Sequence, residues 1–179
     1  MMIRMIKKNG KETLYWQAWN YKFPLSILTG TLGKEGIEER PSLRFWESPK
    51  KIVKKLAKEK ANLGYEFVND KDMNKLVVQY RYEEADEAQF EATEKKCFDV
   101  EDIIEEALLF TGNGDVSGLE VGAGAGTITI FVVDVEIGFN TIWKKLSEHE
   151  LTEGVEIAYE QEQDSYVSLY PEDAEFQLV

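Results

Sequence analysis

The amino-acid sequence predicts an α+β fold built in two parts, and three observations carry that prediction. Strand-like segments of alternating apolar and polar residues are separated by turn residues throughout the chain. Helix-like apolar spacing occurs once in the first part and twice in the second. The net charge is +7 over residues 1–66 and −20 over residues 67–179. This asymmetry favours two units with different surfaces, and we expect domains over residues 1–68 and 74–179.

The length and composition exclude several classes of protein. With 179 residues, 43% of them hydrophobic, the chain can bury one large or two small cores. The longest apolar run, residues 128–133, is too short to span a bilayer, and we expect no signal peptide. The single cysteine, Cys97, rules out an internal disulfide. We therefore expect a bacterial-type cytoplasmic protein in a reducing compartment.

The first part opens with a predicted β-hairpin. Two strand-like runs, residues 2–8 and 13–19, flank Asn9 and Gly10. Asn-Gly between such runs is a strong hairpin signal, because both residues tolerate positive φ angles.

Two more strands are expected on either side of a glycine turn. They cover residues 25–29 and 37–45, and Gly30, Gly33 and Gly36 lie at or between them. Pro41 cannot donate a ladder hydrogen bond, so the second of these strands is predicted to be an edge or an interrupted strand.

A helix follows, with Ser48 as its N-cap, Pro49 at its first position and Gly64 at its end. Its apolar stripe is formed by Ile52, Val53, Leu56, Ala57, Lys60 and Leu63. The sequence therefore predicts a small antiparallel sheet packed by one helix, with most of the lysines of this helix outside the stripe.

The second part begins with a predicted strand over residues 75–82. Residues 83–96 are acidic and poor in large apolar side chains, which favours a loop. A helix is then expected to begin at Asp99, which would cap it, while Phe98 and Ile103 would form a hydrophobic staple.

Two strands, residues 118–121 and 127–133, are expected across the glycine-rich residues 122–126. Asp134 caps a second helix, and further strands are predicted at residues 155–159 and 166–170. The order β-α-β-β-α-β is that of a ferredoxin-like fold, in which an antiparallel sheet carries both helices on one face. The alternative is one continuous sheet in which the two halves merge.

Three features of the first part belong together: the glycine turn at residues 30–36, the helix from Pro49, and the closing Lys60, Gly64 and Tyr65. Together they resemble a WGR domain over residues 3–67. The family occurs in poly(ADP-ribose) polymerases and in bacterial proteins, and it is associated with nucleic-acid contact. By position, Thr29 and Thr31 stand where the family has its Trp and Arg. Threonine can neither stack on a base nor make a bidentate phosphate contact, so the resemblance implies the fold and only weak binding.

The second half also resembles a widespread bacterial module of unknown function. The resemblance lies in residues 112–118, the glycines of residues 122–126 and the strand-like residues 127–131. It implies no activity.

The best candidate for a nucleic-acid site is the lysine-rich helix, at Lys50, Lys51, Lys54, Lys55 and Lys58. The aromatic residues Tyr15, Trp16, Trp19, Tyr21 and Phe23 lie near it in sequence and resemble a stacking platform. The competing interpretation is that these lysines are the solvated face of an ordinary amphipathic helix.

The sequence predicts no catalytic, cofactor or metal site. The glycines of residues 122–126 lead into a β-rich segment, which favours a hairpin over a phosphate loop. One histidine, His149, and one cysteine cannot build a His/Cys zinc site.

The function expected first is that of a non-enzymatic cytosolic binding or regulatory protein that acts through protein contacts. An acidic antitoxin-like or immunity-like inhibitor with a basic partner is one concrete version. The alternative is weak, sequence-independent nucleic-acid binding through the basic N-terminal half.

Overall fold

The computed structural model describes residues 2–20 and 24–179, and these form an α+β fold with two antiparallel sheets and three α-helices. The chain divides into two compact units. The first unit comprises the residues up to Asp72 together with Phe110–Gly112, and the second comprises Met73–Leu109 and Asn113–Val179. Each unit contains one of the sheets, so the predicted α+β class is confirmed.

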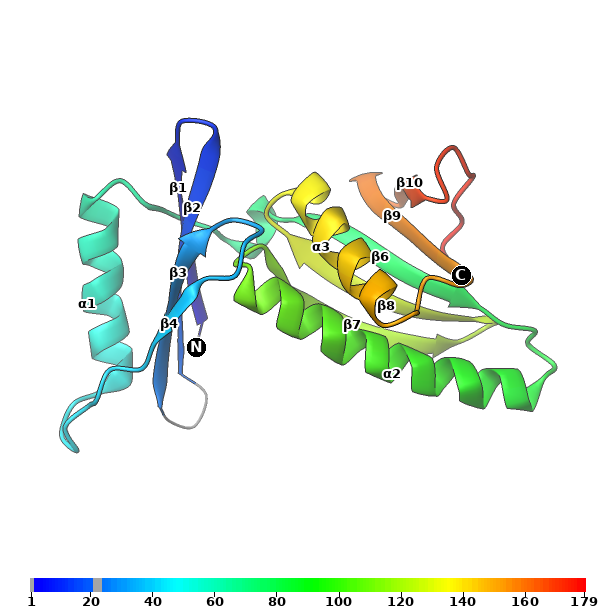
Figure 1. Ribbon diagram of the computed structural model, residues 1–179, viewed down its shortest axis with the longest axis horizontal. Helices are drawn as coiled ribbons and strands as arrows, with labels where there is room; N and C mark the ends of the chain where they lie inside the picture. Colours follow the sequence, from blue (N-terminus) through cyan, green and yellow to red (C-terminus); the bar gives the residue numbers. More distant parts are fainter. Residues whose placement is uncertain (1, 21–23) are drawn as a thin grey trace. The chain divides into compact units, whose positions relative to one another are not determined.

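The first unit is a five-stranded sheet in the order β4-β3-β2-β1-β5, with antiparallel neighbours throughout. Its strands are β1 (Met2–Asn9), β2 (Glu12–Asn20), β3 (Leu25–Thr31), β4 (Ile37–Glu39) and β5 (Glu66–Phe67). Helix α1 (Pro49–Asn62) covers one face of this sheet (Figure 1).

The core beneath α1 follows from the alternation of side chains along β2. It consists of Met5, Trp16, Ala18, Leu25, Ile27, Val53 and Ala57. Trp16 lies on the face that α1 covers, and its neighbour Tyr15 lies on the opposite face, because successive side chains of a strand alternate. Both rings are buried.

Two predictions for this sheet need correction. The first hairpin turns at Gly10 and Lys11, because Asn9 still pairs with Glu12, so the predicted Asn9-Gly10 turn is wrong by one residue. The strand expected over residues 37–45 ends at Glu39. Pro41 has no N–H group and cannot continue the ladder, so the chain leaves the sheet just before it.

Helix α1 has the predicted limits within two residues. It begins at Pro49, and Ser48 takes the N-cap position with extended backbone but without a side-chain cap hydrogen bond. Gly64 follows the helix with φ of +88°. This left-handed conformation lets the N–H of Tyr65 reach back to the carbonyl of Lys60 at 3.1 Å, which ends the helix.

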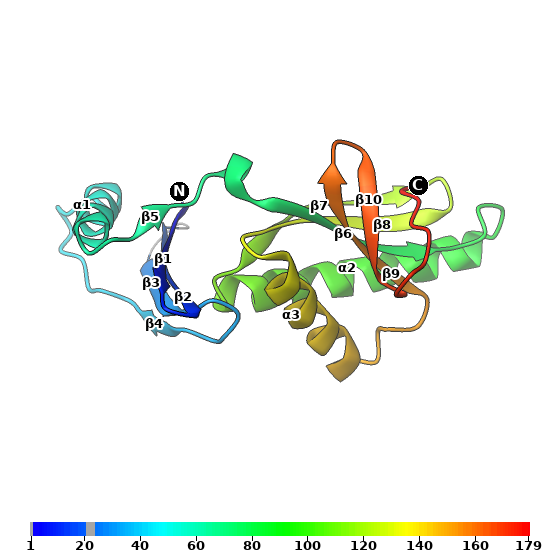
Figure 2. The same cartoon turned by 90° about the horizontal axis from the view of Figure 1, so that it is seen from above.

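The second unit is a five-stranded sheet in the order β10-β9-β6-β8-β7, again antiparallel throughout. Its strands are β6 (Asn74–Arg81), β7 (Gly114–Gly122), β8 (Ala125–Val132), β9 (Val155–Glu162) and β10 (Ser165–Tyr170). Figure 2 shows α2 (Glu87–Phe110) and α3 (Val135–Glu148) on the same side of this sheet. One core joins both helices to β6, β8 and β9.

Helix α2 begins much earlier than the sequence indicated, at Glu87 instead of Asp99. Asp86 is its N-cap: the carboxylate accepts a hydrogen bond from the N–H of Gln89 at 3.0 Å. Asp99 lies in the middle of the helix, so both its predicted cap and the loop over residues 83–96 are wrong. The first half of α2 buries only the small side chains of Thr93 and Cys97.

The glycine-rich residues between β7 and β8 form the predicted hairpin. Gly122 pairs with Ala125, and the two turn residues Ala123 and Gly124 have φ angles of +50° and +86°. At the next connection Asp134 caps α3 as predicted, accepting from the N–H of Ile137 at 2.9 Å.

The face of the second sheet that the helices leave open is crossed by the C-terminal residues. Gln79 of β6 is fully buried there, and its amide donates to the carbonyl of Gln177 at 3.1 Å. The same side chain accepts from the N–H of Val179 at 3.2 Å. A buried amide on a sheet face is thus satisfied by backbone groups of the tail.

Candidate functional site

The five lysines predicted as a nucleic-acid site lie together on the exposed side of α1. Their positions are Lys50, Lys51, Lys54, Lys55 and Lys58, which we call the basic face, and all are exposed. The buried side of the helix is made by Pro49, Val53 and Ala57. The helical spacing of the sequence therefore predicted correctly which side of α1 is exposed and which is buried.

Few carboxylates neutralise the basic face. Lys55 reaches Glu59 at 3.9 Å with both side chains exposed. Among the described residues, the other four lysines have no ion-pair partner. The charges of the basic face are therefore available to an anion in solution.

Lys60, the next lysine along α1, belongs to a different arrangement. Its ammonium group lies 5.4 Å from the ring centroid of Tyr65, and that of Lys7 lies 5.9 Å from the same centroid. Lys7 also donates to the carbonyl of Leu63 at 2.7 Å. These contacts fasten the C-terminal end of α1 to β1, which gives Lys60 and Tyr65 a structural role.

The aromatic platform expected from the sequence does not form as predicted. Tyr15 and Trp16 are fully buried on opposite faces of the first sheet, and Trp19 is half-buried. Tyr21 and Phe23 lie outside the residues that the structure describes. Tyr15 and Trp16 cannot stack on a ligand from these positions.

Tyr15 instead explains the glycine turn. A Cβ atom at Gly36 would overlap the Tyr15 hydroxyl, so this position needs glycine, and a Cβ at Gly30 would make tight contacts of 3.0 Å with the Tyr15 ring and with Gly36. The hydroxyl donates to the carbonyl of Phe110 at 2.9 Å. Burial raises the pKa of Tyr15 to about 12, and the charge of Glu35 adds to the shift. The glycine turn at residues 30–36 therefore has a packing role.

Three aromatic residues in the described part of the first unit are exposed: Phe67 of β5, at 52%, and the adjacent Phe45 and Trp46, which the sequence pattern did not place in any site. Phe45 is 95% exposed and Trp46 is 65% exposed. Leaving a phenylalanine in water forgoes about 1.5–3 kcal/mol of burial, so such exposure calls for a reason. Their rings meet edge to face, with centroids 4.6 Å apart.

These two residues occupy the tip of a hydrogen-bonded turn over residues 44–47, which we call the aromatic turn. The N–H of Glu47 donates to the carbonyl of Arg44 at 2.9 Å. In return, the Glu47 carboxylate accepts from the N–H of Arg44 at 2.8 Å. This reciprocal pair fixes Phe45 and Trp46 at the two central positions of the turn.

The aromatic turn is anchored at both ends. Leu43, just before it, packs against the core beneath α1. Pro49, two residues after it, is buried and begins α1. The turn therefore leads directly into the helical turn that carries Lys50 and Lys51. The Arg44 guanidinium adds a further cation, 5.6 Å from the ring centroid of Trp46.

A signal for this site was present in the sequence, in the run Arg44-Phe45-Trp46-Glu47-Ser48-Pro49. Phe45 and Trp46 lie just ahead of the Ser48-Pro49 helix start, so they cannot belong to the apolar stripe of the helix. The strand predicted over residues 37–45 includes Phe45 but not Trp46, so the two rings are not recognised as a pair.

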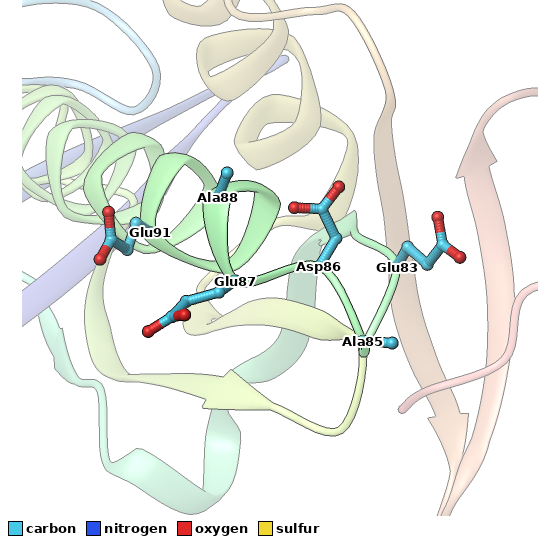
Figure 3. Close-up of a pocket in the computed structure, with 6 residues that line it drawn as sticks. All are labelled: Glu83, Ala85, Asp86, Glu87, Ala88 and Glu91. Atoms are coloured by element: carbon cyan, nitrogen blue, oxygen red, sulfur yellow. The ribbon is translucent and has the colours of Figure 1, made fainter.

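The second unit has an acidic hollow at the start of α2, shown in Figure 3. It is lined by Glu83, Ala85, Asp86, Glu87, Ala88 and Glu91. The four carboxylates point in different directions in Figure 3, and that of Asp86 is used as the helix cap. Across residues 2–20 and 24–179, no group of His, Cys, Asp and Glu side chains is arranged to hold a metal ion.

Cys97 lies in the core of the second unit and not at a surface. It is fully buried, and burial raises the pKa of its thiol to about 11. A buried thiol with a raised pKa is a poor nucleophile at neutral pH.

Comparisons with known proteins identify no relative of this chain. No protein-family model matches the chain, and neither curated proteins nor solved structures give a match. Within the described part of the chain, no helix is long and apolar enough to cross a membrane.

Proposed function

We propose that the protein is a non-enzymatic binding protein whose first unit binds nucleic acid through the basic face and the aromatic turn. One observation carries the proposal: five exposed lysines, of which only Lys55 pairs with a carboxylate among the described residues, follow two exposed aromatic rings in the chain. Lysines neutralise phosphates, and flat rings stack on bases. The missing motif residues at Thr29 and Thr31 predict binding without sequence preference.

The charge of the chain limits this contact to the first unit. Residues 67–179 carry a net charge of −20, which repels a phosphate backbone. The +7 of residues 1–66 is concentrated in α1, whose six lysines and one glutamate give a net charge of +5. Electrostatic attraction therefore brings a polyanion to α1 first.

Protein contact through the acidic second unit was the function expected first from the sequence. Its acidic hollow offers no convergent set of side chains, since the carboxylates of Glu83, Asp86 and Glu91 point apart (Figure 3). The basic face and the aromatic turn are the more specific arrangement. We accordingly place nucleic-acid binding ahead of an antitoxin-like or immunity-like role with a basic protein partner.

The finer fold assignments are part of the same proposal. We propose that the first unit is WGR-like, supported by a sheet packed by one helix after a glycine turn. A ferredoxin-like second unit is supported by the β-α-β-β-α-β order and by the central strand order β9-β6-β8-β7. A cytoplasmic location is supported by the lone buried cysteine.

The test is binding of fluorescently labelled oligonucleotides, measured by anisotropy at low salt with the full chain. Replacement of Lys51, Lys54, Lys55 and Lys58 by Glu should abolish binding, because it reverses the basic face without touching its buried side. For the wild type, log affinity should fall with log salt, by roughly 0.7 for each phosphate neutralised on a single strand and 0.9 on a duplex.

A matched control reverses four exposed lysines elsewhere: Lys8, Lys11, Lys71 and Lys95. It changes the net charge by the same amount, so retained binding would locate the effect in the basic face. Equal loss in both variants, or no binding by the wild type, would refute the proposed site.

A further inference from the structure

We propose that the aromatic turn stacks on unpaired bases, so that the first unit selects single-stranded over duplex nucleic acid. This inference rests on the proposed function and names the form of nucleic acid that the same surface accepts. It is carried by Phe45 and Trp46, which the sequence pattern did not assign to any site.

The first step is that both rings have faces free for a ligand. Phe45 is 95% exposed, and its ring contact is the edge-to-face one with Trp46. Trp46 is 65% exposed even though the Arg44 guanidinium lies 5.6 Å from its ring centroid. An aromatic ring with a free face is a sequence-tolerant partner, because every base has a π-face.

The second step is that the rings are held in place before any ligand arrives. The hydrogen bonds between Arg44 and Glu47 close the turn, and Leu43 and Pro49 anchor it to the core. Stacking on such a turn orders little additional backbone, which lowers the entropic cost of binding. An aromatic side chain in a long flexible loop would not have this advantage.

The third step is that cations are at hand for the backbone of the same strand. Arg44 precedes the rings, and Lys50 and Lys51 follow them in the first turn of α1. Positively charged residues therefore flank Phe45 and Trp46 in the amino-acid sequence. A single nucleic-acid strand whose bases stack on these rings has cations close by for its phosphates. Rings and charges in alternation are the arrangement used to bind single strands.

A duplex cannot use the rings in this way, since each base face is already stacked on its neighbour. Inserting Phe45 or Trp46 would require unstacking a step of the duplex. The basic face alone remains for duplex contact, so duplex should bind by charge only and more weakly.

A lipid surface is the competing occupant, since exposed aromatics beside lysines also occur at membrane interfaces. An interfacial helix buries a continuous apolar stripe in the lipid. The stripe of α1 is already buried against the sheet through Val53 and Ala57. Two rings beside the charged Glu47 are a small apolar surface for lipid but a sufficient one for bases.

The experiment compares a labelled oligothymidylate with a duplex of equal length, by anisotropy at low salt, for the full chain and three variants. The double variant Phe45→Ala/Trp46→Ala should weaken single-strand binding by roughly tenfold or more, and leave duplex binding nearly unchanged. Trp46→Phe keeps a ring and should retain most of the affinity. Phe98→Ala, at a 55% exposed position of α2, is the matched control and should change nothing.

The salt dependence separates this inference from the proposed function. The Phe45→Ala/Trp46→Ala variant should keep the wild-type salt slope, because no phosphate contact is lost, whereas reversal of the basic face should abolish binding to both nucleic acids. Equal affinity of the wild type for the two nucleic acids, or an unaffected double variant, would overturn the stacking site and leave charge-driven binding standing. Absence of all binding by the wild type would overturn both.

Vesicles of phosphatidylcholine with phosphatidylserine provide the last arm. Two results together would overturn the inference in favour of a membrane site. The wild type would sediment with these vesicles and the Phe45→Ala/Trp46→Ala variant would not, while both proteins bound oligothymidylate equally well. Circular dichroism of each variant checks that the fold is intact, which the exposure of both side chains leads us to expect.

Discussion

The hydroxyl oxygen of Tyr15 occupies the space that a Cβ atom at Gly36 would need. The two residues also share an acceptor: the Tyr15 hydroxyl and the Gly36 N–H donate to the same carbonyl, that of Phe110, at 2.9 and 3.0 Å. Tyr15 and Gly36 therefore form a tightly packed pair within the first unit, and each constrains the other.

Replacing Gly36 by Ala should lower the free energy of unfolding by roughly 1–3 kcal/mol, because the added methyl group overpacks the site. Denaturant unfolding of the full chain, followed by circular dichroism, measures the loss. Gly118→Ala is the control: its Cβ would meet no atom within 4 Å, so stability should stay the same or rise. A loss at Gly118 equal to that at Gly36 would contradict the packing argument.

A second substitution tests which atom causes the overlap. Adding Tyr15→Phe to Gly36→Ala removes the hydroxyl oxygen and should recover part of the lost stability. Recovery should be incomplete, since the carbonyl of Thr29 would still lie 2.7 Å from the new Cβ. The non-additive part of the double-mutant cycle is the measure of the contact between the two side chains.

The same tyrosine should make stability fall at alkaline pH. Its pKa rises from the ordinary 10.0 to about 12 in the folded protein, so the unfolded chain ionises first. Stability contributed by neutral Tyr15 is complete below pH 10 and is lost progressively as the pH rises towards 12. Denaturant series across this range should show a shallower decline for Tyr15→Phe than for the wild type.

Other groups titrate in the same range and define the control. Burial raises the pKa of Cys97 to about 11 and raises that of Tyr80 as well. Both groups are present in the wild type and in Tyr15→Phe, so the difference between the two proteins isolates Tyr15. Parallel declines in the two proteins would show that Tyr15 titrates normally.

Much of the fold was predictable, because regular spacing reports local structure. The apolar stripe of α1 and its Pro49 start gave the helix and the exposed side that carries the lysines. Asp134 ahead of a periodic apolar segment gave α3. These predictions succeeded where large apolar residues mark the buried side of an element.

The first half of α2 was missed because its buried side is made of small residues. Thr93 and Cys97 pack where a Cβ at Gly126 would otherwise lie, so the glycine of β8 makes room for the helix. A helix face of threonine and cysteine does not stand out as apolar in sequence. The close approach that makes it a core face depends on a glycine some thirty positions away.

Of the candidate site, the sequence predicted the lysines of the basic face but not the aromatic turn. The basic face follows from helical spacing, but the exposure of Phe45 and Trp46 depends on where Glu47 donates and accepts hydrogen bonds. Large aromatic residues are usually buried, so sequence favours a core role for them. Tyr15 and Trp16 are also adjacent aromatic residues, but both are buried, one on each face of the first sheet. Residue type alone does not distinguish this buried pair from the exposed pair Phe45 and Trp46.

The start of α2 provides the last prediction, because two aspartates compete for the role of N-cap. The structure assigns it to Asp86, whose carboxylate accepts from the N–H and from the side-chain amide of Gln89 at 3.0 and 2.9 Å. Asp86→Ala should therefore lower the free energy of unfolding by about 1 kcal/mol. Asp86→Asn should lose little, since asparagine is an equally good cap.

Asp99→Ala, at an exposed position inside the helix, should leave stability unchanged or raise it, because alanine is the better helix former. Denaturant unfolding of the three variants distinguishes the two starts: a larger loss for Asp99→Ala than for Asp86→Ala would place the beginning of the helix at residue 99 and contradict the cap at Asp86.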